Sequence, residues 1–167
     1  MDWSVRPVDP GTYAVTDVFE GLVGSHTLTS LYPEESARLA AIGSARLVVT
    51  REDVYGYVDD EDGTIYLGHE HLVGGKPVVV YLDILHELVH VKQLHEGRDL
   101  YDTRFAYVDR PTEIEAYALV VEEARQLGMS ETEIAEYLYV EWASPKDHER
   151  LCRRLGVKAP GESPKRT

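Results

Sequence analysis

The sequence has little cysteine, few basic residues and no long hydrophobic run, and each shortage excludes a class of protein. Its 167 residues include a single cysteine, Cys152, so no internal disulfide can form and a four-cysteine zinc site is excluded. No apolar run approaches the ~20 residues of a transmembrane helix, so we expect no membrane insertion. The acidic, proline-interrupted N-terminus, MDWSVRPVDPG, is unlike a signal peptide. We therefore expect a soluble, cytoplasmic protein.

Acidic residues dominate the charge. The 17 Lys and Arg residues stand against 30 Asp and Glu residues, which gives a net charge of −13. Because such a chain repels phosphate backbones at long range, we expect no nucleic-acid partner. The length and the hydrophobic content of 43% fit one compact domain. We predict a single domain over residues 1–157 and a disordered tail over residues 158–167, whose sequence is KAPGESPKRT.

Strand patterns come first along the chain and helical patterns later, which is typical of an α+β protein. Segments rich in β-forming residues predict strands over residues 13–19, 46–50, 54–58 and 64–67, the last two joined as a hairpin by the turn DDEDG. Apolar spacing, caps and glycine stops predict helices over residues 33–42, 78–97, 111–127, 130–141 and 144–156. We expect a small mixed or antiparallel sheet packed on the second of these helices, with further helices towards the C-terminus.

The helix predicted over residues 78–97 contains the sequence HELVH, an H-E-x-x-H pattern from His86 to His90. Helix positions four apart differ by about 40°, so both imidazoles can reach one metal ion. Glu87 projects beside the pair, where it can take a proton from a metal-bound water. Two histidines, a carboxylate and an open water position are the hydrolytic arrangement of zinc, so we expect one Zn²⁺ per chain. The alternative is that both histidines are ordinary hydrogen-bonded side chains.

A third ligand must come from elsewhere in the chain. The pattern H-E-x-x-H-x-x-G-x-x-H is excluded because Gln93 occupies its glycine position and His95 lies one residue out of register. Two glutamates of the next predicted helix, Glu113 and Glu115, are better candidates. They lie about 200° apart around the helix, so only one can face the metal. Thr112 and Glu115 also match a capping box, which would give Glu115 a structural role.

The sequence HELVH followed, 23 residues after His90, by the pattern E-x-x-A-Y resembles the gluzincin branch of the zincin metallopeptidases. The short chain is similar to the soluble minigluzincins, and the resemblance covers residues 78–127. It implies a zincin-like fold, hydrolysis of peptide bonds in a peptide or protein substrate, and Glu113 as the third zinc ligand. Ala116 matches the small residue of the family pattern. Tyr117 stands where the family usually has Asp or Asn, and its hydroxyl could take over that hydrogen bond.

Further side chains are candidates for stabilising the transition state or supporting the ligands. Tyr101 and Tyr107 lie between the two helices of the motif, and His95 lies at the end of the first. The segment from His69 to His71 follows the strand over residues 64–67, and if it is the sheet edge that borders the cleft, it could pair with the backbone of an extended peptide. There the two histidines would share one face and could form a second metal site, or would simply be exposed in a loop.

An alternative function keeps the metal without proteolysis. About 40 residues follow the helix over residues 111–127, which is more than a minimal catalytic unit needs. The protein could therefore be a latent peptidase, or a zinc-binding sensor or interaction module on the same fold.

Overall fold

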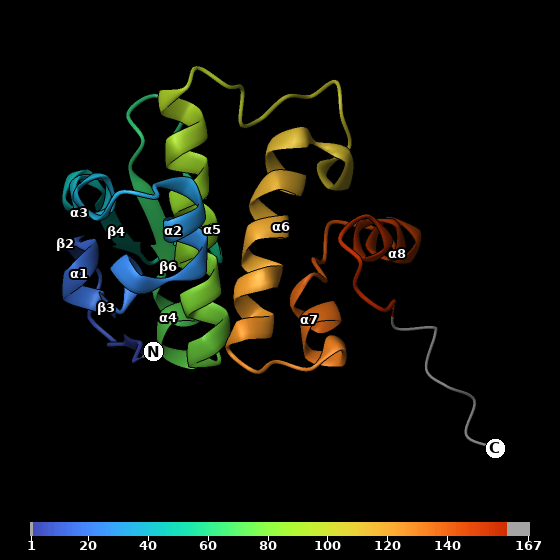
Figure 1. The fold of residues 1–167 in the computed structure, drawn as a ribbon, viewed down its shortest axis with the longest axis horizontal. Helices are drawn as coiled ribbons and strands as arrows, with labels where there is room; N and C mark the ends of the chain where they lie inside the picture. Colours follow the sequence, from blue (N-terminus) through green and yellow to red (C-terminus); the bar gives the residue numbers. More distant parts are fainter. Residues whose placement is uncertain (1, 160–167) are drawn as a thin grey trace. The chain divides into compact units, whose positions relative to one another are not determined.

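The computed structural model describes residues 2–159 (Figure 1). The chain divides into two compact units, Met1–Leu100 and Tyr101–Thr167. The boundary between the two units lies within residues 1–157, for which the sequence predicts a single domain. The single domain stays a prediction. Of the predicted disordered tail, residues 160–167 lie outside the described residues, whereas Ala159 is described and buried.

A four-stranded mixed sheet forms the centre of the first unit, in the strand order β2-β4-β6-β5. Its strands are β2 (Gly11–Ala14), β4 (Arg46–Thr50), β5 (Gly56–Val58) and β6 (Ile65–Gly68). Strands β4 and β6 run parallel, with Leu47 opposite Ile65, and the other two pairs are antiparallel. A second, two-stranded sheet pairs β1 (Ser4–Val5) with β3 (Phe19–Glu20). The mixed α+β class with small sheets is thus confirmed, and β5 is an edge strand.

Helix α5 (Pro77–His95) packs against β5 and β6 and carries the H-E-x-x-H sequence. It begins with proline at its first turn, where the missing N–H has no intrahelical partner to lose. It ends just before Gly97, whose φ of +80° is a conformation that glycine adopts without strain. The sequence predicted one apolar stripe, but the helix is buried nearly all round, because other elements of the first unit, among them β1 and α2 (His26–Leu31), also pack against it.

The remaining helical elements of the first unit are short, and the sequence missed most of them. They are α1 (Val15–Val18), η1 (Leu22–Gly24), α3 (Glu35–Ser44) and α4 (His69–Gly74). The prediction of one continuous strand over residues 13–19 is wrong at α1. There the Asp17 carboxylate accepts the backbone N–H of Ala14, and Val15 and Val18, three residues apart, are both buried.

The second unit is helical in its described part. It contains η2 (Tyr107–Asp109), α6 (Pro111–Gln126), α7 (Glu131–Tyr137) and α8 (Pro145–Arg154). A capping box begins α7, with Ser130 and Glu133 each bonding the other's backbone N–H. Arg150 of α8 donates two hydrogen bonds to Asp109 of η2, both 2.9 Å long. Across residues 2–159, no helix combines the length and the apolar character needed to cross a membrane.

Candidate metal centre

His86 and His90 lie one turn apart on α5, and both are buried. Their Nε2 atoms are 3.0 Å apart and their rings meet edge to face at 83°. Two nitrogens bound to one tetrahedral zinc ion lie roughly 3.3 Å apart. The two nitrogens therefore already have nearly the spacing that a shared metal ion requires.

Gln93 orients His90, a role that the H-E-x-x-H pattern does not include. Its Oε1 lies 2.7 Å from Nδ1 of His90, and its side chain is almost fully buried. Because an amide oxygen can only accept, Nδ1 of His90 donates this hydrogen bond, and the Nε2 of His90 carries a lone pair that faces the Nε2 of His86 across 3.0 Å. A glutamine three positions after a motif histidine is the sequence signal that could have found it.

Glu87 faces the edge strand of the sheet. A Cβ atom built on Gly56 of β5 would lie 3.7 Å from Oε1 of Glu87, so the strand passes close beside this carboxylate. Glu87 is buried. The condition that the segment over residues 64–71 is the sheet edge is not met, because β6 pairs with β4 on one side and with β5 on the other. The edge strand beside α5 is β5.

Burial separates the two glutamates proposed for the third position. Glu113 is 6% exposed, whereas Glu115 lies on the exposed side of α6. The capping box predicted for Thr112 and Glu115 is wrong: α6 already begins at Pro111, and no side chain caps it. Glu115 is therefore neither buried nor the capping residue of α6.

One buried group of candidate ligands is found in the described part of the chain. His86, His90 and Glu113 each offer one ligand atom, and these atoms all lie within 4.8 Å of one another. Two imidazole nitrogens and one carboxylate oxygen are a donor set that suits zinc better than the oxygen-seeking ions magnesium and calcium. This group could hold a metal ion.

Comparisons with protein-family models, with curated proteins and with solved structures find no match to this chain. The functional argument therefore rests on the residues of the site.

The tyrosines proposed as further site residues have different surroundings. The hydroxyl groups of Tyr107 and Tyr117 are 2.7 Å apart and share one hydrogen bond. Tyr117 is buried, and its ring also meets that of Tyr137, while the ring of Tyr107 meets that of Trp142. Tyr101 is exposed. Tyr117 thus pairs with Tyr107 inside an aromatic cluster of the second unit.

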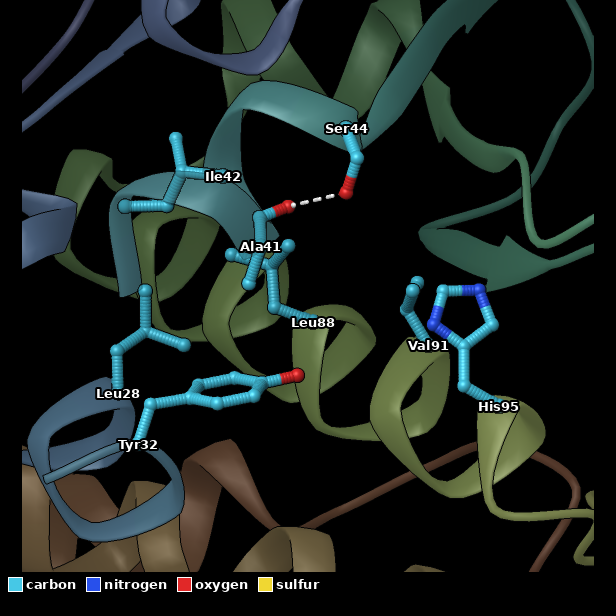
Figure 2. Close-up of a pocket in the computed structure, with 8 residues that line it drawn as sticks. All are labelled: Leu28, Tyr32, Ala41, Ile42, Ser44, Leu88, Val91 and His95. Carbon is cyan, nitrogen blue, oxygen red and sulfur yellow. Dashed lines mark hydrogen bonds between the residues drawn. The ribbon is translucent and has the colours of Figure 1, made fainter. Parts of the chain in front are cut away.

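His95 lies on the other side of α5 from the histidine pair, because nine residues turn a helix by about 180° from His86. It lines a small cavity of about 30 Å³ in the first unit (Figure 2). The other lining residues come from α2, the turn after α2, α3 and α5, and are Leu28, Tyr32, Ala41, Ile42, Ser44, Leu88 and Val91. Burial raises the pKa of Tyr32 above its usual value. The cavity has room for one or two water molecules, so it is too small for a peptide, and the structure does not bring His95 to His86.

The segment from His69 to His71 is the first turn of α4 and not a loop. The expectation that the two histidines share a face is wrong, since helix positions two apart point about 200° away from each other. His71 instead bonds Asp83 of α5, with 2.6 Å between its Nε2 and the carboxylate Oδ2. Within residues 2–159 the histidines of α4 belong to no group of three metal-ligating side chains.

Proposed function

We propose that this protein is a zinc-dependent metallopeptidase, with His86, His90 and Glu113 as the ligands and Glu87 as the general base. One observation carries the proposal. The Nε2 atoms of the two histidines lie 3.0 Å apart while Gln93 holds the proton of His90 on its other ring nitrogen. A buried imidazole oriented in this way is prepared to give a lone pair to a metal. The buried carboxylate of Glu113 supplies the third donor.

Zinc bound by this group would supply Lewis acidity, which polarises a carbonyl group and lowers the pKa of water. The protein's own part falls to Glu87. One residue after His86 on the helix, it would accept the proton of the attacking water and then pass that proton to the nitrogen of the leaving amine. Its burial keeps bulk water away from both transfers.

The edge strand suggests a peptide as the substrate. Strand β5 has β6 on one side only, so its other side can accept the backbone of an extended peptide. Gly56 of β5 brings this edge next to Glu87 without a side chain in between. A peptide that adds to β5 would therefore pass its backbone along the general base.

Zinc content tests the ligand set. Plasma mass spectrometry would compare wild type, His86→Ala, Glu113→Ala and the matched control Glu115→Ala, whose glutamate is exposed on the same helix. We expect one zinc per chain in wild type and in Glu115→Ala, and loss of zinc in the other two. Absence of zinc from wild type supplied with the metal would overturn the proposal. Retention in Glu113→Ala would remove Glu113 from the ligand set.

Hydrolysis tests the role of Glu87. The Glu87→Gln variant should keep its zinc and lose cleavage of a mixed peptide substrate such as denatured casein, because an amide cannot accept the proton. Cleavage at the wild-type rate would contradict this role. Zinc binding by wild type without cleavage of any peptide would leave a zinc-binding module in place of an enzyme.

A further inference from the structure

Asp83 is the one position of α5 between Val80 and Val91 that is not buried. Its side chain is 20% exposed. Its Oδ2 receives the short hydrogen bond of 2.6 Å from the ring of His71, and in the described part of the chain no other partner of this carboxylate is found. The bond fixes the rotamer of Asp83 and leaves its other oxygen able to accept from a ligand.

Helical geometry places this carboxylate beside the candidate metal centre. Asp83 precedes His86 by three residues and Glu87 by four, so it lies about 60° and 40° from them and one turn nearer the N-terminus of α5. A peptide held against Glu87 would therefore carry one of its neighbouring side chains past Asp83.

An aromatic ring completes the arrangement. Tyr55 meets the ring of His71 edge to face, with 5.0 Å between centroids, and is 41% exposed. It directly precedes Gly56, the β5 residue beside Glu87. The sheet edge and the helix thus present two neighbouring pairs: Gly56 with Glu87, and Tyr55 with the pair His71–Asp83.

We propose that Asp83, held by His71 and flanked by Tyr55, forms a subsite for a cationic side chain, lysine or arginine, next to the scissile bond. This inference rests on the proposed peptidase function. The available carboxylate oxygen would accept from the ammonium or guanidinium group. The exposed ring of Tyr55 would cover the aliphatic part of the side chain. The net charge of −13 also raises the local concentration of cationic peptides.

Binding to the Glu87→Gln variant tests the subsite without turnover. A series of neutral fluorescent peptides carries a single lysine at successive positions, and a matched series carries norleucine, which lacks only the ammonium group. The Kd of each peptide for the zinc-supplemented variant is measured by fluorescence anisotropy. We expect lysine to bind about tenfold tighter at one position. Adding Asp83→Asn should abolish this preference with norleucine binding unchanged. Adding the control Glu70→Gln, an exposed acid on α4 next to His71, should keep it.

Charge reversal gives a second variant. Asp83→Lys should favour a glutamate at the position where lysine was preferred. Three results would overturn the subsite. They are equal binding of the lysine and norleucine peptides by the Glu87→Gln variant, no binding of any peptide, and an unchanged lysine preference after Asp83→Asn is added. Failure of the proposed function is seen separately, as a wild-type protein that cleaves none of the same peptides.

Discussion

At the scale of single residues, α5 concentrates polar groups where an apolar helix would pack more easily. His86, Glu87, His90 and Gln93 are all buried, although their neighbours on the helix are mostly aliphatic. Burying polar groups is unfavourable unless each has a partner. The bond between Gln93 and His90 satisfies two of them and at the same time selects the tautomer that a metal ligand needs. The arrangement is therefore more readily explained by metal binding than by stability.

Replacing Gln93 tests whether its hydrogen bond prepares His90 for metal binding. Gln93→Leu removes the acceptor of the His90 Nδ1 proton, and we expect zinc affinity to fall by about 10- to 100-fold, the usual effect of losing such an orienting bond. Gln93→Glu keeps an acceptor at the same place and should keep the affinity. Competition with a chromophoric chelator measures both. Equal zinc affinity in the leucine variant and wild type would show that the hydrogen bond does not orient the ligand.

At the scale of elements, sequence patterns predicted the long helices and missed the short ones. Helices α5, α6 and α8 carry periodic apolar residues, a proline in the first turn and a glycine after the end, and all three are confirmed with small shifts at their ends. Helices α1, α2 and α4 have six residues or fewer. Such helices depend on tertiary contacts more than on their own sequence, so the sequence could not show that His69 and His71 lie on a helix.

The sheet order is also set by contacts distant in sequence. The hairpin of β5 and β6 was predicted, and its register, with Val58 opposite Ile65, follows from the acidic turn. The parallel pairing of β4 with β6 was not predicted, and it is this pairing that leaves β5 at the edge beside Glu87. The motif itself, H-E-x-x-H, could be found because local spacing alone places its two histidines on one side of a helix.

A glycine at the end of β6, Gly68, packs against the loop between β4 and β5. A Cβ atom at Gly68 would overlap the carbonyl oxygen of Val54, and the N–H of Gly68 donates to the carbonyl of Tyr55. Gly68→Ala should therefore lower the free energy of unfolding by about 2 kcal/mol or more, because backbone atoms must move apart. Urea unfolding measures the change.

The matched control is Gly43→Ala. Gly43 lies inside α3, where an added Cβ meets no atom within 4 Å. Alanine there should stabilise by about 0.5–1 kcal/mol, since glycine is unfavourable within a helix. Equal stability of the two variants would show that the loop yields to the added methyl group.

At the scale of the whole molecule, a bound ion and the net charge would both affect stability, and experiments with different cations can distinguish the two effects. Anything that binds only the native state raises the melting temperature. A chain with a charge of −13 is also stabilised by any cation that screens its self-repulsion. Magnesium screens this charge but prefers oxygen ligands, whereas zinc also accepts the imidazole nitrogens of His86 and His90.

Chelation should therefore destabilise wild type by a specific amount. Zinc at about 100 times its Kd adds about 2.7 kcal/mol, so we expect EDTA to lower the melting temperature by roughly 5–10 °C. Zinc should restore it and an equal concentration of magnesium should not. Scanning calorimetry would include His86→Ala, which should not respond, and Glu115→Ala, which should respond like wild type. Equal rescue by the two metals would mean that the effect is charge screening, and that the buried group of His86, His90 and Glu113 holds no ion.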